Sequence, residues 1–531
     1  MKLITPRQVS MADRYAAETM GVSIIEMIES AAEALFRRCV CFRRVTVLCG
    51  GGNNGADGLC AAQKLYRHGV SVKVWIVGKN GLSGSNDNCR FFLDKLSAQG
   101  IIVKELDLEK DISLYEKDLE KDISDCNAVL ECILGTGFVP GRRAKTDNSL
   151  YKVFEIVNGK SEYTVSADIA AGVNGENGET GINAVCADET LTFAYLKPGH
   201  VILPGKARCG KVTVVPVSVP EEAYGASVDT FFEAFCKEDL KRIKKMLPVR
   251  DPFGHKGSFG KVLVIAGSEG MTGAAILGTR ACLRSGAGLC YLAAPRGLLG
   301  IYETTVPEAV KVPLGEAKDK WLKPEFCEQL VSLAEGMDAV LIGPGVGRRD
   351  ETLALVREFL KRCTCPNIIA DADGLRALTE NPKEIKTVFE NRNVVLTPHW
   401  GEITYLLGDK AKDCKGRLDA VKNCSENYGA VTVLKGNDSI TYKDEKHYTV
   451  NTTGNSGMAT GGSGDVLAGI VASFLAAGMS AYDAARVGVF VHGLAGDMAK
   501  EKLTEFSMTA GDVAECLGDA FKRIINDNGE G

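Results

Sequence analysis

The sequence lacks the features that mark secreted, membrane and nucleic-acid-binding proteins. Its 18 cysteines include no C-x-x-C pair, which favours reduced, buried thiols over a disulfide framework or a zinc site. The first residues, MKLITPRQVS, contain no apolar core of a secretory signal, and no predominantly apolar, charge-free run is long enough for a membrane helix. The net charge of -5 argues against nucleic acid as the main partner. We therefore expect a cytoplasmic protein that acts on small molecules and binds no membrane.

The length predicts more than one domain, because 531 residues exceed the usual size of a single domain. Hydrophobic content of 45% and charged content of 25% are typical of globular proteins. A change of composition near the middle suggests a first domain over residues 1–222, a linker over 223–250 and a second domain over 251–531. The linker combines turn residues with a short charged helix, expected over Lys237–Leu247, that ends before Pro248.

The most informative stretch runs from Asn451 to Ile470 and reads NTTGNSGMATGGSGDVLAGI. Its glycines allow the backbone to approach an anion closely, and the apolar helical pattern that follows points unpaired N–H groups at the same place. The stretch therefore predicts an anion hole. Asp465, at the start of the helix, is suited to be a general base, although an aspartate there is also a common helix cap.

The first domain contains a glycine-rich turn between a strand and a helix. Gly50, Gly52 and Gly55 satisfy G-x-G-x-x-G directly after an apolar strand over 45–49, which is the setting of a dinucleotide-binding loop. The next strand, expected over 70–77, ends in Gly78-Lys79 and not in an acidic residue. The pattern therefore argues against a standard hydride-transferring dehydrogenase and favours a phosphate or nucleotide loop of another kind.

Strands followed by polar loops recur along both domains, so the fold class is α/β with doubly wound sheets. In the second domain the repetition brings one set of residues to one edge of the sheet: Gly343 to Gly347, Asp371, Asp373, His399, Glu402, Lys435 and Gly436. Taken singly, Asp371 or Asp373 could cap a helix beginning at Gly374, and His399 could be an ordinary loop histidine. Thr509 and Asp512 also have the spacing of a helix cap.

The first-domain motifs GGGNNGADG, ILGTGF and ADIAAGVNGENGETG resemble the Rossmann-like epimerase domain of NAD(P)H-hydrate repair enzymes. That resemblance implies interconversion of the R and S hydrates at C6 of a damaged nicotinamide ring, with Asp168 as the acid/base group. It also implies a potassium ion at Asn54, Glu131 and Ala171. The substrate residues that it implies are Asn53, Asn54, Gly55, Asp57, Gly135, Thr136, Gly137, Phe138 and Gly141.

This sequence departs from the family pattern at the potassium site. Glu131 replaces an aspartate ligand, Ala170-Ala171 replaces Pro-Ser, and Ala56 replaces a glycine. Residues 30–32 also differ from the family's Asn-Ala-Gly. An alanine offers a cation only its backbone carbonyl. The departures leave open a first domain that binds the hydrated nucleotide without turning it over.

The second-domain motifs HKGSFG, GSEGMTGAA, GPGVG, ADADGL, TPHWGE, LKG and GMATGGSGD resemble, in order, the ribokinase-like dehydratase of the same repair enzymes. The resemblance implies that a nucleotide, by analogy ADP with Mg²⁺, phosphorylates the hydroxyl of the S hydrate and that phosphate then leaves. Asp465 would be the catalytic base. The substrate would contact Gly273, Ala274, Gly345, Gly347, His399 and Asp465; the nucleotide would contact Lys435, Gly436, Asn437, Asp438, Ser439, Gly461, Gly462, Ser463 and Gly464.

Two other functions remain compatible with the sequence. A small-molecule kinase shares the anion hole, although the first domain and the TPHWGE and HKGSFG motifs favour the dehydratase. A nucleotide-binding regulator would carry a first domain that recognises its ligand without catalysis. The expected substrates are the hydrates of NADH and NADPH. We also expect a homo-oligomer, because doubly wound domains commonly assemble.

Overall fold

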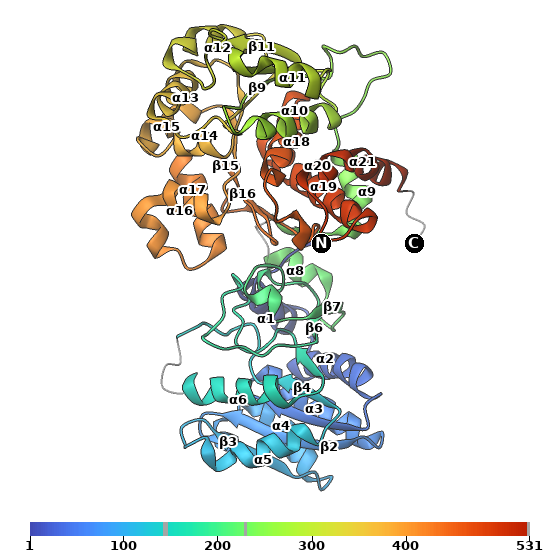
Figure 1. Ribbon diagram of the computed structural model, residues 1–531. Coiled ribbons are helices and arrows are strands. Elements are labelled where there is room, and N and C mark those ends of the chain that lie inside the picture. Colours follow the sequence, from blue (N-terminus) through green and yellow to red (C-terminus); the bar gives the residue numbers. More distant parts are fainter. Residues whose placement is uncertain (142–146, 228–230, 528–531) are drawn as a thin grey trace. The chain divides into compact units, whose positions relative to one another are not determined.

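The computed structural model describes residues 1–141, 147–227 and 231–527, and the chain divides into two compact units. The first unit is Lys2–Phe231, and the second is Phe232–Gly531 together with Met1. Figure 1 shows that strands alternate with helices in both units. Each unit has the α/β architecture that the sequence predicts.

The first unit is built on a sheet of seven strands in the order β3-β2-β1-β4-β5-β6-β7. Every neighbouring pair is parallel. The strands are β1 (Arg44–Cys49), β2 (Ser71–Gly78), β3 (Val103–Asp107), β4 (Ala128–Cys132), β5 (Thr164–Ala167), β6 (Glu189–Phe193) and β7 (Lys211–Val215). The strand order reverses between β1 and β4, and the loops after these strands border the crevice where doubly wound sheets bind ligands.

Helices cover both faces of this sheet. They are α1 (Pro6–Thr19), α2 (Ile24–Cys39), α3 (Asn53–Arg67), α4 (Asp87–Ser97), α5 (Ser113–Ser124), α6 (Asp147–Lys160), α7 (Pro198–Val201) and α8 (Glu221–Ser227), with short 3₁₀ turns η1 (Gly81–Gly84) and η2 (Gly205–Ala207). Consecutive residues of β1 enter opposite cores: Val47 packs with Leu59 of α3, and Leu48 packs in the cluster of Phe154 of α6. The alternation follows from the two-residue period of a strand.

The second unit contains a sheet of ten strands in the order β11-β10-β9-β12-β13-β14-β15-β16-β17-β8. The pairs from β11 to β15 are parallel, whereas β15–β16 and β16–β17 are antiparallel. The strands are β8 (Phe231–Phe235), β9 (Lys261–Ile265), β10 (Leu289–Pro295), β11 (Val310–Leu314), β12 (Ala339–Ile342), β13 (Asn367–Ala370), β14 (Asn393–Leu396), β15 (Val431–Leu434), β16 (Ile440–Asp444) and β17 (His447–Asn451).

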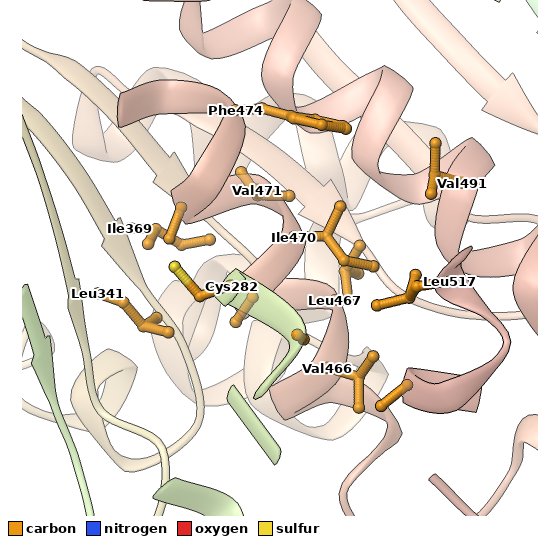
Figure 2. Packing of buried hydrophobic residues seen from close by; sticks show 14 of the residues in the cluster. Cys282, Leu341, Ile369, Val466, Leu467, Ile470, Val471, Phe474, Val491 and Leu517 are labelled. Atoms are coloured by element: carbon orange, nitrogen blue, oxygen red, sulfur yellow. The ribbon is translucent and has the colours of Figure 1, made fainter. Parts of the chain in front are cut away.

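Helix α18 (Ser463–Ala476) lies in the core of the second unit, which explains why it is apolar on nearly every side. Figure 2 shows Val466, Leu467, Ile470, Val471 and Phe474 surrounded by residues of the sheet and of neighbouring helices. The other helices are α9 (Leu240–Met246), α10 (Thr272–Arg284), α11 (Leu299–Thr305), α12 (Cys327–Ala334), α13 (Asp350–Arg362), α14 (Asp373–Arg376), α15 (Pro382–Phe389), α16 (Trp400–Leu407), α17 (Arg417–Tyr428), α19 (Ala481–Lys502), α20 (Ala510–Glu515) and α21 (Leu517–Asn526). Short 3₁₀ turns are η3 (Lys237–Asp239), η4 (Arg296–Leu298), η5 (Pro324–Phe326), η6 (Gly408–Asp413) and η7 (Ser456–Met458).

The segment 223–250, interpreted from the sequence as a linker, contains regular structure, although its residues 228–230 lie outside the described part. Strand β8 forms the edge of the second sheet next to β17. Phe235, Leu240 and Ile243 are buried in the core of the second unit. The sequence placed a helix over Lys237–Leu247; the structure has a 3₁₀ turn followed by α9. Most of this segment therefore belongs to the second unit.

Several smaller predictions can be compared directly with the structure. All 18 cysteines are free thiols, and 15 of them are buried. Thr509 is the N-cap of α20, and its backbone N–H donates to Asp512. Within the described residues, every helix is too short or too polar to cross a lipid bilayer.

Candidate functional sites

The first unit contains a cavity of about 1420 Å³ at the carboxyl ends of its strands. The loop that begins α3 forms one wall, and the loop after β4 forms another. Eight residues named from the sequence line it: Asn53, Asn54, Asp57, Gly135, Thr136, Gly137, Phe138 and Asp168. The sequence motifs, far apart along the chain, therefore meet at one cavity large enough for a nucleotide.

Asp168 is held by a lysine that the sequence analysis did not identify. Lys197, whose side chain is 0% exposed, places Nζ 2.5 Å from Asp168 Oδ1. Thr192 Oγ1 and the backbone N–H of Phe193 donate to the same oxygen, each at 3.2 Å. Burial alone would raise the pKa of Asp168, but Lys197 outweighs it and holds that pKa below its ordinary value. Asp168 is therefore an ionised carboxylate.

The backbone at Asp168 is also constrained. Its φ is +63°, which is uncommon for a residue other than glycine. Its carbonyl oxygen lies 2.8 Å from His200 Nε2, while the backbone N–H of Lys197 donates to His200 Nδ1 at 3.0 Å. Because Nδ1 accepts that hydrogen bond, Nε2 carries the proton and donates to the carbonyl. Burial and the charge of Lys197 lower the pKa of His200 to about 4, so the imidazole is neutral.

Two further carboxyl groups, Asp13 of α1 and Asp57 of α3, line the same cavity. Burial, and then the charge of Asp168, raises the pKa of Asp13 to about 6. Burial, and then the charge of Asp168, also raises the pKa of Asp57 well above its ordinary value. The three aspartates therefore differ in their pKa, which is lowered for Asp168 and raised for Asp13 and Asp57.

The residues of the expected potassium site have different surroundings. Asn54 fits a ligand role, because both polar atoms of its side chain are buried without a hydrogen-bond partner. Glu131 is fully buried and its carboxylate accepts from Ile133 N at 2.7 Å, Ser166 Oγ at 2.8 Å and Ala171 N at 3.1 Å. Burial nevertheless raises the pKa of Glu131 to about 7. These donors occupy Glu131 without a cation.

Two glycines named as substrate residues, Gly55 and Gly141, are not among the residues that line the cavity. A Cβ on Gly55 would lie 1.8 Å from the carbonyl oxygen of Gly50. Gly55 is therefore required because the first turn of α3 packs against the glycine-rich loop.

In the second unit, the predicted anion hole lies at the N-terminus of α18. Gly462 precedes the helix with φ of +92°, where a side chain would be strained. A Cβ on Gly461 would meet no atom within 4 Å, so this backbone is open to a ligand. Ser463 Oγ lies 3.3 Å from Nε2 of His492, a buried histidine of α19. Burial and then the charge of Lys435 lower the pKa of His492 to about 4.

Asp465, in the first turn of α18, belongs to a group of charged side chains around Lys435. Lys435 Nζ lies 2.7 Å from Asp371 Oδ1 and 3.7 Å from Glu402 Oε2. Burial, and then the charge of Asp371, raises the pKa of Asp465 to about 7, although Lys435 opposes the increase. Asp465 is therefore poised to accept a proton near neutral pH.

The loops after β9 and β12 adjoin each other beside this group. A Cβ on Gly345, whose φ is +61°, would lie 3.0 Å from the Cβ of Ala274. The backbone N–H of Gly347 donates to Asp373 at 3.2 Å. A Cβ on Gly273 would meet no atom within 4 Å. The predicted substrate glycines therefore come from the first turn of α10 and from the loop after β12, at the point where the strand order reverses.

His399 is the N-cap of α16. Its Nδ1 accepts from the backbone N–H of Glu402 at 3.2 Å, and Glu402 accepts from the backbone N–H of His399 at 2.8 Å. The ring is exposed. His399 is thus a capping residue, and its Nε2 lies 3.6 Å from Glu402 Oε1.

The loop after Lys435, predicted to contact a nucleotide, is partly occupied by its own contacts. Asp438 is fully buried and lies 3.0 Å from Arg417 Nε. The Ser439 hydroxyl donates to the carbonyl of Gly436 at 2.8 Å. Gly436 and Asn437 are exposed. Asp438 and Ser439 therefore shape the loop, and its exposed backbone is the part that can meet a ligand.

Sequence reasoning missed Lys197, Asp13, His492 and Arg417. Lys197 had a signal, since it is a single lysine between an apolar strand and a proline. Asp13 lies in an ordinary amphipathic helix, and no sequence signal marked it as a functional residue. The contacts of His492 and Arg417 join segments that are remote in sequence.

Two family models match the chain. The model described as NAD(P)H-hydrate dehydratase matches residues 262–518, and the model described as YjeF-related protein N-terminus matches residues 17–199. The bifunctional NAD(P)H-hydrate repair enzyme Nnr of Moorella thermoacetica is 32% identical, covering 99% of this chain and 97% of that protein. The protein of the same name from Escherichia coli is 30% identical, covering 98% and 93%.

Solved structures resemble part of the chain. A ribokinase-like superfamily protein from Enterococcus faecalis is 26% identical, with a TM-score of 0.47, and covers 55% of this chain and 96% of its own. An ADP/ATP-dependent NAD(P)H-hydrate dehydratase from Bacillus subtilis, co-crystallised with ATP and Mg²⁺, is 25% identical, with a TM-score of 0.43, and covers 54% and 97%.

Proposed function

The chain belongs to the family of bifunctional NAD(P)H-hydrate repair enzymes, and we propose that its two units divide the repair between them. The first unit, functionally residues 1–222, interconverts the R and S hydrates of NADH and NADPH. The second, functionally residues 251–531, dehydrates the S hydrate to the reduced nucleotide at the expense of ADP, which becomes AMP and phosphate.

The observation that carries the dehydratase assignment is the position and protonation of Asp465. It lies in the first turn of α18, and its pKa of about 7 suits a general base at neutral pH. Asp465 removes the proton of the 6-hydroxyl while that oxygen attacks the terminal phosphorus of the nucleotide. The N–H groups from Gly461 to Gly464 stabilise the phosphoryl group in transit. Phosphate is a far better leaving group than hydroxide, so the C6–O bond then breaks, C5 loses a proton and the C5=C6 double bond of the reduced nicotinamide forms.

Lys435 has a different role from the one expected for a simple nucleotide contact. Because its ammonium lies between Asp371 and Glu402, it limits the repulsion between these carboxylates and the entering phosphates. The exposed backbone of Gly436 and Asn437 contacts the nucleotide, while His399 and the glycines at 273, 345 and 347 contact the hydrated ring.

Mg²⁺ is the metal expected for this phosphoryl transfer. No group of three or more His, Cys, Asp or Glu side chains among residues 1–141, 147–227 and 231–527 forms a metal-binding cluster. The described residues therefore fit a Mg²⁺ ion whose ligands are mainly phosphate oxygens, as is usual for this ion. When bound, the ion would neutralise the charge of the phosphates.

We propose no potassium ion for the first unit, because the carboxylate of Glu131 already accepts three hydrogen bonds from the protein. We propose that the enzyme acts in the cytoplasm as a homo-oligomer with small-molecule substrates alone. The composition and the doubly wound units support this assignment.

The test is to give the full-length protein the purified S hydrate of NADH with ADP, with ATP or with neither, and to follow the return of reduced-nicotinamide absorbance. Recovery with ADP is expected. The R hydrate, given with ADP, should also be recovered, because the first unit converts it to S. If neither nucleotide restores absorbance, the dehydratase assignment is wrong; if only the S hydrate is recovered, the first unit binds without catalysis.

A further inference from the structure

The cavity of the first unit contains more acid/base chemistry than Asp168 can supply. One oxygen of Asp168 accepts from Lys197, Thr192 and Phe193. A carboxylate stabilised in this way holds its negative charge and exchanges protons poorly near neutral pH. Epimerisation of a carbinol beside a ring nitrogen nevertheless requires a proton to be delivered and recovered. Another group in the cavity must therefore carry that proton.

Asp13 is placed to do so by the packing of α1. Thr5 caps this helix, its side chain accepting from the backbone N–H of Gln8 at 3.3 Å. Ala12 and Ala16 are buried in a cluster with Tyr224 of α8. Asp13, next to Ala12, is partly buried and lines the cavity together with Asp168 and Lys197.

The groups around Asp13 come from four other segments. Asp168 follows β5 and carries a negative charge, Lys197 precedes α7 and carries a positive one, and Asp57 of α3 and Tyr224 of α8 line the same cavity. Burial and Asp168 raise the pKa of Asp13, while Lys197 opposes the increase. Burial, and then the charges of Asp168 and Asp13, also raise the pKa of Asp57. Asp57 is buried whereas Asp13 is half-buried, so Asp13 is the one of the two with better access to the cavity and to water.

We propose that Asp13 is the catalytic acid/base of the epimerase site and that Asp168 stabilises positive charge without exchanging a proton. The proposal rests on the epimerase function of the first unit. Protonated Asp13 donates its proton to the 6-hydroxyl oxygen, and the C6–O bond breaks with both electrons leaving on water. The lone pair of N1 forms a second bond to C6, which becomes planar. Water then adds to the other face of C6, and Asp13 takes the released proton back.

The proton and the water are both recovered in this sequence, so no oxidant, reductant or nucleotide is consumed. The planar intermediate is cationic, and the ionised carboxylate of Asp168 is suited to stabilise it. Lys197 keeps Asp168 ionised while Asp13 alternates between its two forms. The two aspartates thus have separate roles that follow from their different environments.

The experiment compares full-length wild-type protein with D13N, D13E and D87N, using the R hydrate of NADH without any nucleotide. The two hydrates are separated chromatographically, and the uncatalysed rate is subtracted at each pH. D13N should lose about 100-fold or more in kcat, whereas D13E should recover part of it. Asp87, a fully exposed aspartate of α4 that is not among the residues lining the cavity, is the matched control, and D87N should leave the rate unchanged.

The pH profile separates catalysis from structure. In the wild type, kcat should fall as pH rises above about 6, because the acid form of Asp13 is lost. In D13N this decrease of kcat with pH should disappear. Dehydration of the S hydrate by D13N, with ADP, reports that the chain has folded. The assignment of Asp13 would be overturned if D13N kept a kcat within about threefold of wild type, or if its kcat fell with rising pH as in the wild type. A wild-type protein that fails to interconvert the hydrates would instead refute the epimerase function itself.

Discussion

Each unit contains a proposed catalytic-site aspartate near a lysine, but the lysine is used in opposite ways. In the first unit Lys197 binds Asp168 directly, at 2.5 Å, and lowers its pKa. In the second unit Lys435 binds Asp371, at 2.7 Å, and leaves Asp465 with a pKa raised to about 7. The comparison shows that an aspartate near a lysine is an electrostatic anchor or a general base according to which carboxylate the ammonium contacts.

The largest expected effect comes from removing the base. D465N should lower nucleotide-dependent dehydration by roughly 10²–10⁴-fold, because an amide cannot accept the hydroxyl proton. The measurement is the return of reduced-nicotinamide absorbance from the S hydrate. D350N, which changes an aspartate in the first turn of α13, is the control and should behave as wild type. Near-normal dehydration by D465N would show that another group is the base.

The next effect should appear in stability. K197M removes the fully buried cation that pairs with the partly buried carboxylate of Asp168, and breaking a buried ion pair typically costs about 3–5 kcal/mol of unfolding free energy. K64M removes a more exposed ion pair with Glu33, at 2.7 Å, and should cost less than about 1 kcal/mol. Thermal unfolding measures both, with dehydration by the second unit as an internal check. Equal losses in the two variants would mean that Lys197 is not an essential partner of Asp168.

The third effect is on the pH dependence of dehydration. Asp465 acts as a base only when ionised, so kcat/KM should fall about tenfold per pH unit below its pKa of about 7 and level off above it. Lys435 lowers this pKa, and K435M should therefore move the midpoint to higher pH, whereas K435R should move it less. A midpoint below pH 5 in the wild type would contradict the assignment.

The smallest effect is expected on exchanging cations. Replacing K⁺ by Na⁺ should change interconversion of the R and S hydrates by less than about twofold, because protein donors already satisfy Glu131. Purified protein, dialysed into each salt at equal ionic strength, provides the comparison. A strong requirement for K⁺ would mean that Asn54 holds an ion with other oxygen atoms.

The anion hole and the glycine-rich turn of the first unit could be predicted because each is local. The residues from Gly461 to Asp465 are contiguous, and so are those from Gly50 to Gly55. The pairing of charged side chains could not be predicted from the sequence. Lys435 and Asp371 are 64 positions apart, and Lys197 and Asp168 are 29 positions apart. Which carboxylate a buried ammonium contacts depends on packing that no local pattern encodes.

The interpretation of 223–250 as a linker shows a different limit of prediction from sequence. Proline and charge predicted a connection there, but FFEAF, the sequence of β8, is also an apolar strand. A short strand at a sheet edge has no helix or motif beside it to reveal its partner. Its place beside β17 depends on the completed sheet.

The position of β8 determines how the two activities could be separated as proteins. The backbone N–H of Thr452 donates to the carbonyl of Phe235 at 2.9 Å, next to the end of β17. A fragment that began at Asp251 would lack β8 and α9, and β17 would present unpaired backbone groups at an open edge. Open edges recruit strands from other molecules. Such a fragment should aggregate, whereas one that retains the residues from Phe231 onward should remain monodisperse.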